Sequence, residues 1–164
     1  MRVNPIPVIA AMLLFMLSSH AQDSSRYRIL FKDTSFIPSK NITAGAITGV
    51  SQSALRADRN TKSFVVIQFE NIPGEQEKQQ LKLAGIELLD YIPNNAYSAT
   101  VTGSLNSQAL AQLKARAVIE MSPALKMQPA LLAGNYPAWA TKVPGTIDVW
   151  ISFPKSYSFE TVSN

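Results

Sequence analysis

The pattern of apolar and polar positions predicts a folded unit that begins near residue 63. Residues 63–70 (SFVVIQFE) are dense in β-branched and aromatic side chains, which indicates a strand buried on at least one face. The next residues, 71–74 (NIPG), break this strand. Residues 75–84 (EQEKQQLKLA) are strong helix formers with acids in the first turn, and Gly85 follows where a left-handed residue commonly ends a helix.

A β-hairpin is predicted directly after this helix. Residues 86–92 (IELLDYI) and 96–101 (AYSATV) are two strand-like runs separated only by Pro93-Asn94-Asn95. Proline removes a ladder donor, and asparagine tolerates the positive φ that tight hairpin turns require. The two runs therefore predict an antiparallel pair.

A second helix and a fourth strand complete the pattern. Residues 106–116 (NSQALAQLKAR) predict a helix with Leu110 and Leu113 on its buried side, and residues 118–121 (VIEM) predict a short strand. The order is strand, helix, strand, strand, helix, strand. It predicts an α+β, ferredoxin-like split βαβ fold (β-α-β-β-α-β), in which both helices cover one face of a four-stranded antiparallel sheet.

The first 21 residues predict a cleaved secretory signal. Arg2 precedes the apolar run 8–17 (VIAAMLLFML), and Ser19 and Ala21 are small residues just before Gln22. Because the run is shorter than the ~20 apolar residues that span a bilayer, a signal is favoured over a membrane anchor. We expect cleavage between Ala21 and Gln22, no stable anchor afterwards, and a secreted or periplasmic/extracellular location.

A basic segment, residues 22–62, separates the signal from the folded unit. Loss of the signal takes only Arg2 from the 15 basic residues of the chain, which leaves 14 against 11 acidic residues. This excess is too small to indicate nucleic acid as a partner. Since no aromatic series accompanies the charges, the segment is interpreted as a solvated, poorly packed arm.

The folded unit extends to residue 128, and the rest of the chain predicts a connector and a second unit. Residues 129–145 are rich in proline and glycine and read as a connector. Residues 146–153 (TIDVWISF) resemble 63–69 and lead through a proline-containing turn to a helix start at 158–160. We expect 146–164 to be the first strand and helix start of a second, truncated repeat.

The residue inventory argues against catalysis by this chain. The only histidine, His20, lies in the signal, and the chain has no cysteine, so no Ser-His-Asp, Cys-His or His/Cys metal set can be built from the mature chain. No glycine-rich phosphate loop occurs. We therefore expect no catalytic, cofactor-binding or metal residues. Asn41-Ile42-Thr43 matches the N-glycosylation pattern.

Residues 64–129 are similar to the N-terminal propeptide of secreted subtilisin-like serine proteases, particularly large bacterial ones of the Bacteroidota type. Four stretches carry the resemblance: Val66-Ile67-Gln68-Phe69; the run from Gly85 to Tyr97 with its Tyr-Ile-Pro-Asn-Asn-Ala-Tyr sequence; Leu105 to Val118; and the exit Lys126 to Pro129. The resemblance implies a ferredoxin-like prodomain that assists folding of a serine-type endopeptidase and inhibits it. It implies a subtilisin-like catalytic domain, in cis, as the partner.

The sheet face opposite the helices is the expected docking surface, because an uncovered face needs polar side chains or a partner. Strict alternation along the first hairpin strand offers Leu89 and Tyr91, with Tyr97, or else Leu88 and Ile92. The alternative function is a free-standing exported protease inhibitor or envelope-associated interaction module. A reading frame that continues past Asn164 into a protease domain would distinguish the two.

Overall fold

The computed structural model describes residues 25–31, 34–51 and 61–163, apart from the side chains of Thr161 and Ser163. The expected signal segment 1–21 and its cleavage site, Ala21 and Gln22, lie outside these described residues. Within the described part, every helix is too short or too polar to cross a bilayer.

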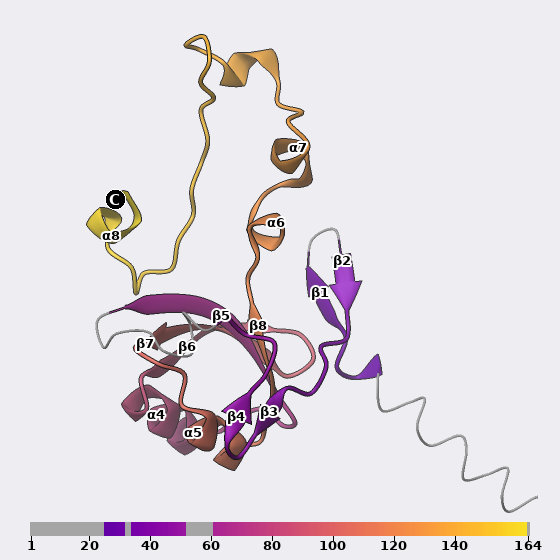
Figure 1. Cartoon of the computed structure of the whole chain (residues 1–164), viewed down its shortest axis with the longest axis vertical. Helices are drawn as coiled ribbons and strands as arrows, with labels where there is room; N and C mark the ends of the chain where they lie inside the picture. The colour runs from indigo at the N-terminus through magenta and orange to yellow at the C-terminus, as the bar shows by residue number, and fades with distance from the viewer. Residues whose placement is uncertain (1–24, 32–33, 52–60, 164) are drawn as a thin grey trace, which may run out of the picture.

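A four-stranded antiparallel sheet forms the centre of the molecule (Figure 1). Its strands are β5 (Lys62–Phe69), β6 (Ile86–Ile92), β7 (Ala96–Thr102) and β8 (Ala115–Glu120). They lie in the order β6-β7-β5-β8, and each neighbouring pair is antiparallel. The predicted α+β class and the four-stranded antiparallel sheet are confirmed.

Two helices, α4 (Glu75–Leu83) and α5 (Ser107–Gln112), pack on one face of this sheet (Figure 1). The core between these helices and the sheet contains the fully buried Leu81 and Leu110, and the partly buried Leu113 packs against it. Leu110 is thus buried as predicted, and Leu113 is half-buried on the predicted side. The strand side of the core comes mainly from alternate residues of β5 and β7: Val65, Ile67, Phe69, Tyr97, Ala99 and Val101.

Residue conformations at the ends of the elements follow the sequence signals in two places. Gly85 has φ +81 after α4, and a Cβ atom there would lie 2.8 Å from the backbone oxygen of Thr102, so only glycine fits without strain. Asn94 and Asn95 have φ values of 71 and 61 in the β6–β7 turn. Both observations confirm the predicted helix end and hairpin.

The second helix is shorter than predicted, and the last strand is longer. The sequence favours a helix over 106–116, but Lys114 takes the left-handed φ of 53, and β8 already begins at Ala115. Ala115 pairs with Phe69 of the central strand. Strand pairing at the sheet edge therefore overrides the local helix propensity of Ala115 and Arg116.

The N-terminal segment packs on the domain where the structure describes it. It forms two small hairpins, β1 (Ile29–Phe31) with β2 (Thr34–Phe36) and β3 (Ile42–Thr43) with β4 (Ala46–Ile47). Three isoleucines of these hairpins are buried: Ile29, Ile42 and Ile47. The interpretation as a solvated arm does not match these residues. We call residues 25–31 and 34–51 the N-terminal strap.

The chain leaves the sheet after β8 and runs away from it before returning (Figure 1). It contains the short helices α6 (Pro123–Lys126) and α7 (Pro129–Leu132) and the 3-10 turn η1 (Ala138–Ala140). We call residues 123–153 the C-terminal arm.

The strand predicted at 146–153 is wrong. These residues have no strand conformation, and none of the described strands pairs with them. Helix α8 (Phe159–Ser163) nevertheless starts where the repeat predicts a helix.

Candidate interaction surface

The sheet face opposite α4 and α5, which we call the second face, is buried at its centre. Gln68, Ser98 and Thr100 are its most buried polar residues. Their apolar neighbours on β5 and β7, Val66 and Ala96, form a small core with Ile29 and Phe31 of the strap, Ile92, Ile119 and Met121. The strap therefore covers one end of the second face.

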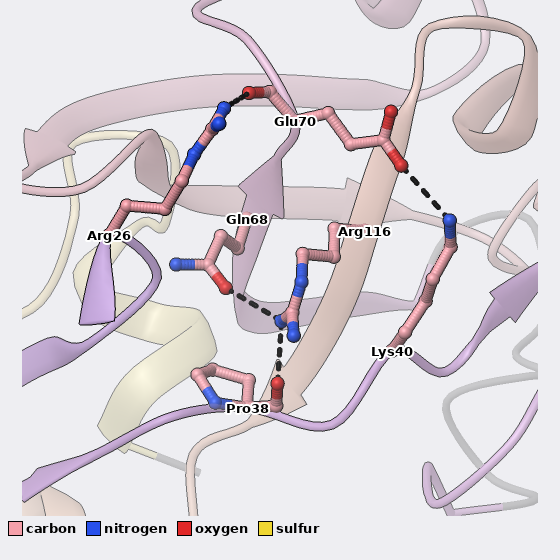
Figure 2. Close-up of polar contacts among 6 residues, drawn as sticks. All are labelled: Arg26, Pro38, Lys40, Gln68, Glu70 and Arg116. Atoms are coloured by element: carbon pink, nitrogen blue, oxygen red, sulfur yellow. Dashed lines mark hydrogen bonds and ion pairs between the residues drawn. The ribbon is translucent and has the colours of Figure 1, made fainter. Parts of the chain in front are cut away.

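Gln68 is fully buried, and its side-chain amide joins the strap to the sheet. Its Nε2 donates to the backbone oxygens of Tyr27 at 2.9 Å and Asn94 at 3.0 Å. Its Oε1 accepts from Arg116 at 3.2 Å, as Figure 2 shows. A buried amide that lacked these partners would cost free energy, so Gln68 fixes where the strap crosses the sheet.

Arg116 links the same site to the next part of the strap (Figure 2). Its guanidinium donates to the backbone oxygen of Pro38 at 2.5 Å and lies 4.4 Å from the centroid of the Tyr27 ring. Arg116 is the residue left unpaired at the irregularity between β5 and β8, where Ala115 pairs with Phe69 and Ala117 with Gln68, and its side chain contacts Gln68.

Glu70 forms a second tie between the strap and the end of β5 (Figure 2). Its carboxylate accepts from Lys40 at 2.9 Å, and its backbone oxygen accepts from Arg26 at 3.2 Å. The hydrogen bond from Lys40 holds the pKa of Glu70 below its usual value near 4.5. Because both side chains are substantially exposed, this ion pair contributes less to stability than the buried amide.

The strap also closes the outer edge of β8. The side chain of Asn41 donates to the backbone oxygen of Val118 at 2.8 Å and accepts from its N–H at 2.9 Å. Further along, the carboxylate of Glu120 accepts from the backbone and hydroxyl of Ser51. A sheet edge with satisfied polar groups is protected from pairing with other chains. Both polar atoms of the Asn41 side chain, including the amide nitrogen of the N-glycosylation pattern, are therefore bonded to Val118 in this fold.

The other end of the second face is covered by residues 154–157, which we call the C-terminal turn. The hydroxyl of Ser156 lies 2.7 Å from that of Thr100, and the ammonium of Lys62 donates to the backbone oxygen of Ser156. The same ammonium lies 6.0 Å from the centroid of the Tyr157 ring. Burial against the sheet raises the pKa of the Tyr157 hydroxyl. The isolated chain therefore covers both ends of the face.

The five residues proposed as docking positions do not divide between faces as strict alternation predicts. A bulge between Leu88 and Tyr91 places Leu89 and Asp90 opposite the single residue Ser98. As a result Leu88 and Tyr97 both belong to the helix-side core, and Tyr91 pairs with Tyr97 across the strands with ring centroids 5.3 Å apart. Ile92 lies against the small core that contains Ile29.

The grouping of Leu89, Tyr91 and Tyr97 against Leu88 and Ile92 is therefore corrected. Of these five side chains, Leu88, Leu89 and Ile92 are half-buried and Tyr97 is buried, whereas Tyr91 is 49% exposed. Only Tyr91 is open enough to meet a partner without a rearrangement.

No assembled metal site occurs among the residues described, since no three His, Cys, Asp or Glu side chains come together there. A groove of about 480 Å³ runs along β8 beneath the strap, between residues 36–41, 48–49 and 118–120. Its ionisable side chains, Lys40 and Glu120, are both paired within the chain, with Glu70 and Ser51.

Sequence reasoning missed Gln68 and Asn41 as the residues that position the strap. Gln68 gave a signal, because an amide inside the apolar run FVVIQF must find buried partners if the strand is central. Asn41 gave none, because its partner Val118 lies 77 residues away.

These observations define an α+β domain whose four-stranded antiparallel sheet is clasped by its own N-terminal strap. The sequence model of the family described as "Domain of unknown function (DUF8729)" matches residues 30–122, more than half of the chain, and the chain belongs to this family. The match runs from within β1 to just past β8, so it includes most of the strap together with the sheet. Neither the curated proteins nor the solved structures contain a match.

Proposed function

We propose that this chain is the exported, non-catalytic prodomain of a subtilisin-like serine endopeptidase, which assists folding of the catalytic domain and inhibits it. The resemblance of residues 64–129 names the partner, and the strand order β6-β7-β5-β8 supports the finer, ferredoxin-like classification. The partner is a catalytic domain of the same protein, in cis.

The exposed C-terminal arm is the observation that carries the proposal. Large apolar side chains along it face solvent: Leu132, Tyr136, Trp139, Val143, Val149, Trp150 and Ile151. Trp150 is fully exposed, at 103%, and its neighbour Ile151 is 68% exposed. Val149, Trp150 and Ile151 are consecutive, and soluble proteins rarely leave contiguous apolar surface uncovered. Burying one isoleucine contributes about 1.5–3 kcal/mol. A protein partner that covers the arm accounts for it.

The arm begins at a suitable place for this role. It follows β8, the strand at one edge of the sheet, so a partner can contact the arm without disturbing β5 or the helices. The strap closes the outside of β8. Most of the large apolar side chains that are exposed in the described chain lie on the arm.

The test is binding and refolding with a separately produced subtilisin-like catalytic domain. We expect the chain 22–164 to inhibit the folded enzyme and to increase the yield of active enzyme when that enzyme is refolded from denaturant. Trp150→Ser should weaken both effects at least several-fold. Leu83→Ser is the matched control, because Leu83 is 90% exposed on α4, away from the arm.

Equal effects of W150S and L83S would show that the arm is not the contact. Failure of the parent chain to bind or to aid refolding would refute the proposal. Inhibition without any gain in refolding would favour the alternative, a free-standing inhibitor.

A further inference from the structure

The C-terminal arm folds back on itself at its end away from the sheet (Figure 1). The backbone N–H of Asp148 donates to the oxygen of Ala140 at 2.7 Å, so the residues between them form a closed loop. The ammonium of Lys142 lies 2.5 Å from the carboxylate of Asp148 and joins the same two sides of the loop. We call residues 140–148 the tip loop.

A tight turn at residues 143–146 reverses the chain inside the tip loop. Pro144 and Gly145 occupy its two central positions, and Gly145 has φ +82. Proline followed by a glycine of positive φ is typical of a type II turn. Thr146 closes the turn with two hydrogen bonds to the oxygen of Val143, from its N–H at 3.0 Å and from its hydroxyl at 2.9 Å. The loop is therefore shaped by bonds within itself.

The tip loop keeps some apolar side chains inside and presents others to solvent. Ala140 is buried and Ile147 is half-buried. By contrast, Val143 is 59% exposed, and Trp139, directly before the loop, is 76% exposed. Compact surface loops that are packed by their own side chains are frequently functional. A loop that is ordered in advance also loses less entropy when a partner binds its exposed side chains.

The charges of the tip loop indicate the kind of surface that it fits. Its two ionisable side chains, Lys142 and Asp148, pair with each other, so the loop carries no net charge. Charged residues are depleted at the centre of protein interfaces, whereas tryptophan is enriched there. An exposed tryptophan beside a neutralised ion pair matches this composition. The complementary surface is an apolar pocket on another protein.

We propose that the tip loop is a preorganised recognition loop, which inserts Trp139 and Val143 into an apolar pocket of the subtilisin-like catalytic domain. Gly145 positions these side chains by allowing the turn, and the ion pair of Lys142 and Asp148 braces the loop and removes net charge from the contact. The inference rests on the proposed function for the identity of the partner. It adds to that function the part of the arm that is shaped before binding and the kind of pocket that receives it.

Hydrogen exchange tests the shape of the loop without any partner. In the chain 22–164, Gly145→Val places a β-branched residue at a positive φ and should open the turn. We expect the amide of Asp148 to exchange at least about threefold faster, while circular dichroism stays unchanged. Gly49→Val is the matched control, because Gly49 has φ +71 and open space around it but lies in the strap. Equal exchange of the Asp148 amide in the parent and G145V would overturn the inference.

Affinity for a separately produced subtilisin-like catalytic domain tests the contact. We expect Gly145→Val and Trp139→Ser to weaken binding at least about threefold, and Gly49→Val to leave it unchanged. Lys142→Met should also weaken binding, although it adds apolar surface, because the carboxylate of Asp148 would enter the pocket without its partner.

The outcomes separate this inference from the proposed function. Faster exchange in G145V with parent-like affinity would overturn the recognition loop and leave the proposed function standing, since Trp150→Ser tests that function on its own. Parent-like binding by W139S would overturn the anchor, and equal or tighter binding by K142M would overturn the apolar pocket. Absence of binding by the parent chain would refute the proposed function and this inference together.

Discussion

Replacing Gln68 by leucine should release the strap and destabilise the domain. The two side chains have similar volumes, so the change removes hydrogen bonds without opening a large cavity. It leaves the backbone oxygens of Tyr27 and Asn94 without their donors and Arg116 without one acceptor. Each lost bond contributes about 0.5–1.5 kcal/mol, and water replaces part of the loss because the three partners are half-buried. We expect Q68L to lower the free energy of unfolding by about 2–4 kcal/mol.

Chemical denaturation measures this loss, and hydrogen exchange locates it. The amides of β1 and β2 should exchange faster in Q68L, since the strap loses its anchor at Tyr27. Gln79→Leu, at an exposed position of α4, is the control and should stay within about 0.5 kcal/mol of the parent. If Q68L unfolds like the parent and its strap amides are equally protected, the amide does not hold the strap and the reasoning is wrong.

The substitution Gln68→Glu separates the donor half of the amide from the acceptor half. The ionised carboxylate of this variant would still accept from Arg116, but it would oppose the backbone oxygens of Tyr27 and Asn94 with an oxygen of its own. We expect Q68E to be no more stable than Q68L at pH 7. Protonation restores a donor, so the deficit relative to the parent should shrink as pH falls. A deficit that does not depend on pH would contradict this account.

Three further predictions concern the core, the helix end and the strap. Leu110→Ala should lower the free energy of unfolding by about 2–5 kcal/mol because Leu110 is fully buried, whereas Leu83→Ala, at a 90% exposed position, should change it by less than about 0.5 kcal/mol. Gly85→Ala should cost at least about 1 kcal/mol more than Gly49→Ala: both glycines have positive φ, but only at Gly85 would the new Cβ meet a backbone oxygen, at 2.8 Å. Because the pKa of Glu70 is lowered, its contact with Lys40 stabilises the folded state above the ordinary pKa near 4.5, and this stabilisation is lost as pH falls through the lowered value. The difference in the free energy of unfolding between the parent and Lys40→Met should therefore vanish in acid. A difference that stays constant with pH would contradict this account.

Local signals were enough to predict the elements whose ends depend on local chemistry. Gly85 ends α4, and Asn94 and Asn95 form the hairpin turn, because positive φ favours these residue types wherever they stand. The buried side of α5 was equally local, since Leu110 and Leu113 share one side of any helix.

Features that depend on distant partners could not be predicted in the same way. The bulge in β6 reverses the alternation after Leu88, and nothing in IELLDYI marks where the register against β7 will slip. The strand predicted at 146–153 has suitable side chains but no described strand to pair with, and a strand exists only as part of a ladder. The strap looked like a solvated arm because its segment carries an excess of basic over acidic residues without an aromatic series, whereas its three buried isoleucines fix its packing.

The closure of β8 by Asn41 fixes an order of events during synthesis. Asn41 and Val118 are 77 residues apart, so at 5–20 residues per second about 4–15 s separate the appearance of the two partners on the ribosome. Gln68 and Arg116 are 48 residues apart, so Gln68 is likewise synthesised well before its partner. Until β8 is made, the strap has no edge to close and β5 lacks one of its two neighbours. The nascent chain therefore cannot complete its fold early, and a polypeptide in that state can still be threaded through a narrow translocation channel.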